Sequence, residues 1–129
     1  MARVVNWPLV AAKYKRGFLE AAPTYLYKRS GSTQFVRGRV FVLSLDLLYG
    51  YFTQGESTPW TRPAYSVQLA GDGDIFLFAP GPDVGDAIAL PNVADGSGTL
   101  DYTVRKIIYD YRGSANTLLR TTLVVARDA

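Results

Sequence analysis

The 129-residue chain contains no cysteine and no histidine, and it has a single methionine. Without cysteine it has no disulfide framework, no thiolate zinc site and no thiol nucleophile. Without histidine it lacks the usual general base, the Ser-His-Asp triad and nearly every zinc-enzyme ligand set. Catalysis would need carboxylates, lysine, tyrosine or a carboxylate-bound metal. We therefore expect a protein that is not an enzyme and that uses no cofactor.

Long hydrophobic runs are also missing. The longest apolar stretch, residues 40–52, is interrupted by Ser44, Asp46 and Gly50, so it is too broken to span a bilayer. The first ten residues contain one arginine but no apolar run of the length that a signal peptide has. We expect no membrane contact and synthesis in the cytoplasm.

The composition favours one globular domain over residues 1–129, with 48% hydrophobic and 19% charged residues. The net charge of +3 hides a segregation along the chain: residues 1–39 carry +7, residues 40–101 carry −7 and residues 102–129 carry +3. Opposite charges of this kind suit packing against copies of the chain or against other partners. Folding that mixes the three blocks on one surface is an equal alternative.

A helix is predicted within residues 1–23, because Asn6 is suited to cap it, Pro8 suits a first turn and Pro23 ends it. The remainder, residues 24–129, reads as short strands separated by Gly- and Pro-rich turns, which predicts a small β-barrel or sandwich. One short internal helix is expected at residues 44–50, and loops are expected at residues 53–64 and 91–99. The apolar face expected of the first helix holds Val10, Tyr14, Phe18 and Ala21, and the expected strands are 24–28, 34–42, 65–69, 75–78, 86–90, 100–111 and 118–126.

Candidate chemistry is sparse. The aspartates at 72, 74, 83 and 86 offer hard oxygen ligands, but their spacing does not match a calcium loop, and aspartate beside glycine is common in turns. No Gly-rich phosphate loop is present. We therefore expect no metal site. A single-strand-binding barrel is a further hypothesis, because aromatic and basic residues lie together on adjacent expected strands, namely Tyr25, Tyr27, Lys28, Arg29, Phe35, Arg37 and Arg39.

Two features suggest contacts with partners. The expected helix carries a basic group, Lys13, Lys15 and Arg16, which forms either a partner contact or an ordinary solvated face. Trp60 lies in the expected Pro-flanked loop, where an aromatic residue is either pinned on the domain or an interface anchor.

From Arg37 onward the order of segments resembles the head-closure (stopper, or head–tail connector) proteins of tailed bacteriophages. The resemblance covers roughly residues 8–127. One departure is Ser57, which stands where a basic residue often follows the Gln-Gly-acid step in that family. The segments that carry the resemblance are residues 37–40, 46–50, 52–56, 84–88, 102–108 and 123–127, which read RGRV, DLLYG, FTQGE, VGDAI, YTVRKII and LVVAR.

The resemblance implies a structural virion protein of the neck. Such proteins are small β-barrels with an N-terminal helical segment, and twelve copies form a ring between the portal–adaptor complex and the tail. The ring retains packaged double-stranded DNA, which passes through its channel. On this hypothesis Lys13, Lys15 and Arg16 contact a neighbour or the adaptor, and Arg37 and Arg39 form salt bridges between subunits. Gln54, Gly55, Glu56 and Trp60 form a loop that faces the channel or the tail.

Other functions remain open. A tail-terminator or capsid-decoration protein also fits a small β-rich chain. A single-strand nucleic-acid-binding barrel predicts salt-dependent binding to oligonucleotides. An enzyme comes last, because it would need a bound metal or a carboxylate pair.

Overall fold

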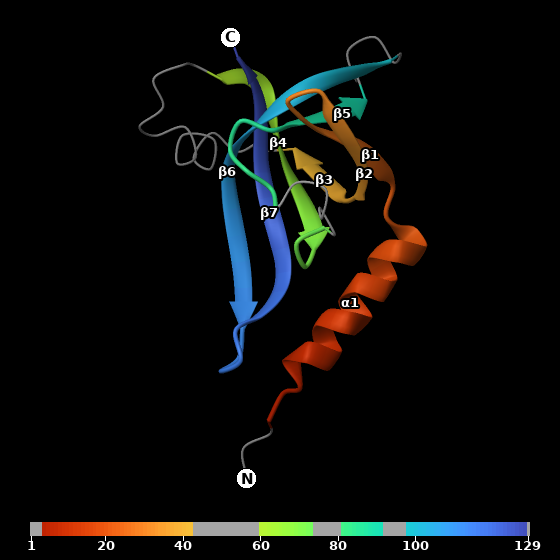
Figure 1. The fold of residues 1–129 in the computed structure, drawn as a ribbon, viewed down its shortest axis with the longest axis vertical. Helices are drawn as coiled ribbons and strands as arrows, with labels where there is room; N and C mark the ends of the chain where they lie inside the picture. Colours follow the sequence, from red (N-terminus) through yellow and green to blue (C-terminus); the bar gives the residue numbers. More distant parts are fainter. Residues whose placement is uncertain (1–3, 43–59, 74–80, 92–97, 129) are drawn as a thin grey trace.

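A computed structural model describes residues 4–42, 60–73, 81–91 and 98–128 of the chain. Within these ranges the fold is mainly β: one N-terminal helix and seven strands in a single antiparallel sheet of order β2-β1-β5-β6-β7-β4-β3 (Figure 1). The expectation of a mainly β chain with an N-terminal helix is confirmed. The elements are α1 (Trp7–Ala21), β1 (Thr24–Arg29), β2 (Ser32–Arg37), β3 (Arg39–Val42), β4 (Trp60–Ala70), β5 (Ala87–Pro91), β6 (Thr99–Arg112) and β7 (Thr117–Asp128).

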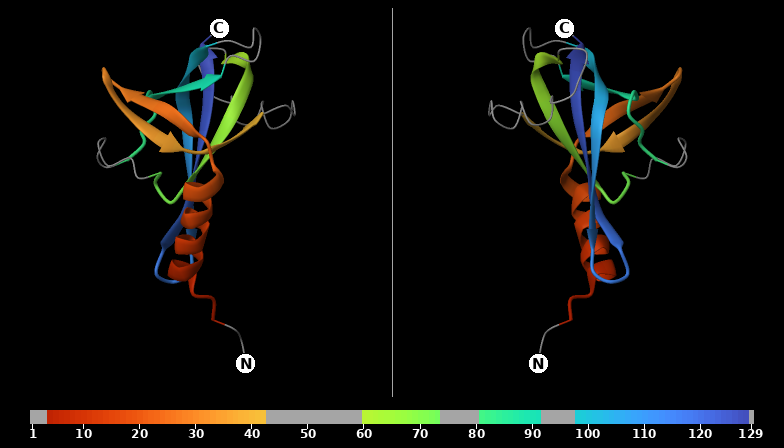
Figure 2. Two further views of the ribbon diagram at one scale, coloured as in Figure 1. Left: turned by 90° about the vertical axis from the view of Figure 1, so that its right-hand side faces the viewer. Right: turned by 90° about the vertical axis from the view of Figure 1, so that its left-hand side faces the viewer.

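The sheet is open, so the predicted closed barrel is wrong for the part of the chain that the structure describes. β2 and β3 are the two edges of the sheet, although Gly38 alone separates them in sequence. The expected strand 34–42 is thus divided between opposite edges. Space at the bend is tight, because a Cβ at Gly38 would lie 3.0 Å from Cγ1 of Val67 and would require that side chain to shift. Figure 2 shows β1 and β2 splayed away from the layer formed by β4, β7 and β6.

The loop boundaries also need correction. Residues 60–64, expected in the loop at 53–64, begin β4, because β7 extends far enough to pair Trp60 with Asp128. The register shifts between Thr61 and Tyr65, the interval that contains Pro63, and proline is tolerated at such irregularities. Pro91 and Thr99, at the ends of the expected loop 91–99, belong to β5 and β6. The expected internal helix 44–50 and strand 75–78 lie outside the described residues.

The local signals in the first segment place α1 correctly. The Asn6 side chain accepts a hydrogen bond from the Leu9 amide at 3.2 Å, as an N-cap does. The helix ends at Ala21, and the amide of the C-cap residue Ala22 donates to the Phe18 carbonyl. The predicted apolar face is buried in part: Phe18 is buried and Tyr14 half-buried, but Val10 and Ala21 are exposed. The reason is visible in Figure 1, where the N-terminal part of α1 runs beside the projecting β6–β7 hairpin rather than across the sheet.

The described residues include two hydrophobic clusters. The larger lies inside the curled sheet and includes Tyr27, Val67, Ile88, Val104 and Leu123. The smaller joins α1 to the end of β4 through Phe18, Ala22 and Ala70, with Tyr14 packed against it. The helix therefore has its own attachment to the sheet, separate from the main core.

Candidate interaction surfaces

The three basic residues of α1 do not form one patch. Lys13 and Lys15 are two residues apart, which is about 200° around a helix axis, so they lie on opposite flanks. Arg16 is exposed on the outward side. Lys15 lines a cleft between α1 and β2. The helix therefore does not present all three cations on one surface. Their role in binding a partner stays a prediction.

Arg37 and Arg39 both contact the C-terminal half of α1. The Arg37 guanidinium donates a hydrogen bond to the Ala22 carbonyl at 2.8 Å. The guanidinium carbon of Arg39 lies 4.8 Å from the centre of the Phe18 ring. The last turn of α1 contains no basic residue, so Arg37 supplies the positive charge that stabilises a helix C-terminus. The predicted salt bridges between subunits remain untested, but both side chains already hold the helix in place.

A cleft opens between the C-terminal half of α1, β2 and the turn after β4. Its volume is about 260 Å³. Phe18 and Leu19 contribute apolar lining from α1, and Phe35 contributes it from β2, where its side chain is 69% exposed. Lys15 and Arg37 provide cations at the same cleft. No acidic residue is among the described residues that line it, so the cleft combines apolar and positive character.

The predicted channel loop is mostly outside the described residues. Gln54, Gly55 and Glu56 lie there, and of Trp60 the structure places only the backbone, at the start of β4. Their role stays a prediction.

A buried carboxylate, Asp86, holds a second surface in place. Arg29 donates two hydrogen bonds to it at 2.7 Å, and the Tyr27 hydroxyl donates one at 2.5 Å. The Asp83 amide donates a further bond at 2.9 Å, and Arg29 also reaches the Gly81 carbonyl at 2.7 Å. Asp86 is only 5% exposed. These bonds tie residues 81–86, which we call the Asp83 loop, to β1.

The same contacts fix the protonation states of the group. Burial acts to raise the pKa of Asp86, but hydrogen bonds from Arg29, Tyr27 and the Asp83 amide, with the Arg29 charge, outweigh it and hold the pKa below the ordinary value. Burial, together with the bond to Asp86, raises the pKa of Tyr27. The bond to Asp86 raises the pKa of Arg29. Asp86 is thus ionised at neutral pH and Tyr27 is protonated.

The tip of the Asp83 loop projects into solvent. Val84 is 58% exposed and Asp83 beside it is exposed. Further bonds brace the tip: the Val84 amide donates to the Asp83 carboxylate at 2.9 Å, and the Gly85 amide donates to the Val104 carbonyl at 2.9 Å. The loop therefore presents an apolar and an acidic side chain on a fixed backbone.

Aromatic side chains of α1 face arginines of the sheet along the whole helix. Arg112 lies 5.3 Å from the Trp7 ring centre, Arg120 lies 5.8 Å from that of Tyr14, and Arg39 covers Phe18. Cation–π contacts of this kind are attractive. Asp110 accepts hydrogen bonds from Arg112 at 2.6 Å and from Arg120 at 3.0 Å, which orients both guanidinium groups. We call this row the aromatic–arginine seam.

The described residues give little support to the other chemistry considered. No group of three or more acidic residues in the described ranges is arranged to hold a metal ion. Among the described residues, no helix is long and apolar enough to cross a membrane. The cations that single-strand binding would use are engaged within the chain: Lys28 bridges to Asp101 at 2.9 Å, and Arg29 bridges to Asp86.

Reasoning from the sequence missed the Asp83 loop and the seam. Gly81 and Pro82 are residues typical of a turn, but the partner of Asp86 is Arg29, 57 residues away, and no local pattern reveals such a pair. For the seam, a usable signal was the spacing of Trp7, Tyr14 and Phe18, which places three aromatic rings on one helix face. The matching arginines come from three separate strands.

Comparisons with known proteins gave no match, whether against protein-family models, curated proteins or solved structures. A function for this chain must therefore be argued from its own surfaces.

Proposed function

We propose that the chain is a non-enzymatic structural subunit that assembles head to tail into a ring, as a head-closure protein of a tailed bacteriophage. On this proposal the ring retains packaged DNA and connects the portal–adaptor complex to the tail. The observation that carries the proposal is that large apolar side chains are exposed on separate elements that face in different directions.

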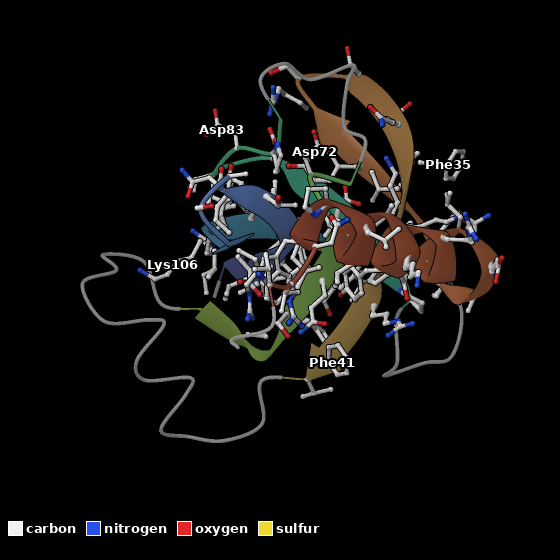
Figure 3. The ribbon with its side chains drawn as sticks, turned by 90° about the horizontal axis from the view of Figure 1, so that it is seen from below. Phe35, Phe41, Asp72, Asp83 and Lys106 are labelled. Atoms are coloured by element: carbon white, nitrogen blue, oxygen red, sulfur yellow. The ribbon has the colours of Figure 1, made fainter. Side chains whose placement is uncertain are left out.

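Phe35 on β2 is 69% exposed, Phe41 on β3 is 49% exposed and Tyr111 on β6 is 54% exposed. In Figure 3, Phe35 and Phe41 project from different sides of the molecule. A two-fold dimer needs one self-complementary patch, whereas a ring needs two different patches on each subunit. Several separated apolar sites therefore favour a ring over a dimer.

The sheet edges support the same proposal. β2 and β3 each pair with one neighbour among the described strands. An exposed edge with a large apolar side chain is normally avoided unless a partner covers it. Both edges carry such side chains, Phe35 on β2 and Phe41 with Val42 on β3.

The test is mass photometry and negative-stain electron microscopy of the purified chain over a range of concentrations, with fluorescence titration of a labelled oligonucleotide in parallel. We expect closed rings of twelve subunits and no tight binding of the oligonucleotide.

A Phe41→Asp variant should assemble more weakly, whereas Leu9→Asp, which changes an equally exposed residue (49%) on α1, should not. A monomer that binds the oligonucleotide tightly and salt-sensitively would reject the proposal in favour of a single-strand-binding protein. A closed ring of another size would favour a tail-terminator or decoration protein.

A further inference from the structure

The Asp83 loop is fixed more firmly than an exposed turn requires. A buried ion pair is costly to desolvate unless its geometry is excellent. Here the Asp86 carboxylate accepts four hydrogen bonds, two from Arg29, one from the Tyr27 hydroxyl and one from the Asp83 amide. Arg29 also donates a hydrogen bond to the Gly81 carbonyl. These contacts leave the tip exposed but immobilise its backbone. A rigid tip loses less conformational entropy when it binds, which is a feature of docking surfaces.

The tip and the cleft have complementary chemistry. The tip offers Val84 as an apolar group and the Asp83 carboxylate next to it. The cleft offers apolar walls from Leu19 and Phe35, with the cations Lys15 and Arg37. Its volume of about 260 Å³ is ample for one aliphatic side chain. Opposite charges beside an apolar contact set the orientation of two docking surfaces.

The two surfaces lie on different sides of one molecule. Figure 3 shows Asp83 and Phe35, which mark the loop and the cleft, projecting from different sides of the fold. A contact between loop and cleft is therefore a contact between two copies. Because the two surfaces differ, such a contact repeats from copy to copy and gives a ring or a filament rather than a two-fold dimer.

We propose that the Asp83 loop of one copy docks into the α1–β2 cleft of the next, with Val84 between Leu19 and Phe35 and the Asp83 carboxylate facing Lys15 and Arg37. This inference rests on the proposed ring-forming function and names two surfaces that meet between neighbouring copies in the ring. The occupant of the cleft is a second copy of this chain.

The absence of cysteine allows a direct test by disulfide trapping. A Val84→Cys variant and a Leu19→Cys variant are mixed under mild oxidation, and the products are separated on non-reducing gels and identified by peptide mass spectrometry. We expect a mixed disulfide between Cys at 84 of one copy and Cys at 19 of the other, because a disulfide requires the two Cα atoms to approach within about 7 Å. Tyr109→Cys is the matched control for Leu19→Cys, since residue 109 is exposed and lies outside the cleft. It should give little mixed product with Val84→Cys.

The outcomes separate this inference from the proposed function. If the wild-type chain forms rings and the mixed disulfide forms only with Leu19→Cys, both stand. If rings form without that disulfide, the ring is built by other surfaces and this inference is wrong. If the disulfide forms but the assemblies are open filaments, the inference holds and the ring proposal fails. If the wild-type chain does not assemble and the mixed cysteine variants give no disulfide, both are wrong.

A charge exchange provides an independent measurement. Lys15→Glu should weaken self-association by about tenfold or more, because it places an acid opposite Asp83. Combining Lys15→Glu with Asp83→Lys should restore most of the affinity. The restoration distinguishes a direct contact from a structural effect, since two unrelated destabilising changes would not compensate. If the double variant loses as much affinity as the two single changes lose together, the two residues do not face each other.

Discussion

At the scale of single residues, Asp86 makes contacts that its neighbours in the sequence do not predict. Its carboxylate joins β1, through Tyr27 and Arg29, to the loop that precedes β5. Removing one partner of a buried charge pair leaves the other charge buried and uncompensated. The same carboxylate fixes the tip that we propose as a docking surface, so stability and assembly are both expected to depend on it.

Asp86→Asn should lower the free energy of unfolding by about 3 kcal/mol, because Arg29 and the Tyr27 hydroxyl lose their charged acceptor. Urea unfolding followed by circular dichroism measures the change. The control is Asp101→Asn, which breaks an exposed ion pair with Lys28 and should cost less than about 1 kcal/mol. Equal losses in the two variants would mean that the Asp86 network contributes no more than a surface ion pair.

Stability should fall in acid for the same reason. Hydrogen bonds from Arg112, opposed by burial, hold the pKa of Asp110 below its ordinary value, and the network around Asp86 lowers the pKa of that group. An aspartate with a lowered folded-state pKa stabilises the fold above its unfolded value, near pH 4, and this contribution is lost as the pH falls toward the folded value. We expect urea midpoints to change little through these groups from pH 7 to 5 and to drop below about pH 4. Asp86→Asn should show a shallower drop, and an unchanged profile in that variant would contradict the assignment.

At the scale of elements, α1 is attached by its aromatic face and not by the main core. The cap Asn6, the first-turn Pro8 and the terminal Pro23 are local signals, so the sequence predicts where the helix begins and ends. The sequence predicts the buried face of the helix only in part. The β6–β7 hairpin projects beside the helix and leaves Val10 exposed. Which strands supply the arginines of the seam depends on strand order, which no local pattern contains.

Phe18→Ala should separate α1 from the sheet. Phe18 is 2% exposed and lies at the centre of the smaller cluster, so its truncation should cost about 3–5 kcal/mol. Leu19→Ala, a change to the exposed next residue, should stay within about 0.5 kcal/mol. Thermal unfolding followed by circular dichroism at a helix-sensitive wavelength compares the two. A similar melting temperature for both variants would show that α1 is not held by this cluster.

Gly113→Ala should loosen the seam at its N-terminal end. Gly113 has a φ of +74°, and an added Cβ would lie 2.6 Å from Cδ1 of Trp7. The change therefore adds a collision to the strain of a left-handed backbone. Gly31→Ala is the matched control, because Gly31 has a φ of +86° with nothing within 4 Å of the added Cβ. We expect about 1 kcal/mol for Gly31→Ala and a larger loss for Gly113→Ala in urea unfolding. Equal losses would show that Trp7 moves aside without cost.

At the scale of the whole molecule, the charge blocks are partly neutralised inside one subunit. Lys28 and Arg29 of the basic first block pair with Asp101 and Asp86 of the acidic middle block. Some of the opposite charges that the sequence suggests for contacts between copies are therefore paired within one subunit. The charged residues that stay exposed include Asp83 at the loop tip and Lys13 on α1.

Of the two lysines on α1, only Lys15 is expected to affect assembly. Lys15→Glu should lower the fraction of assembled protein in sedimentation velocity, because Lys15 lines the cleft. Lys13→Glu makes the same charge change on the opposite flank and should leave assembly unchanged. If both variants assemble equally poorly, the effect comes from net charge and not from the cleft. If neither has an effect, the cleft is not a contact surface.

The sequence by itself determined the mainly β class, the helix from its cap to its terminal proline, and the approximate position of most described strands, because these follow from backbone preferences and short-range periodicity. It also determined that cysteine and histidine chemistry are absent. The tertiary structure alone decided that Gly38 sends one expected strand to opposite edges of an open sheet, that Trp60 begins a strand, and that Arg29 meets Asp86. It also decided that Lys15 and Arg37 share a cleft while Lys13 does not. These outcomes depend on pairings between residues far apart in sequence, whose energies no local window contains.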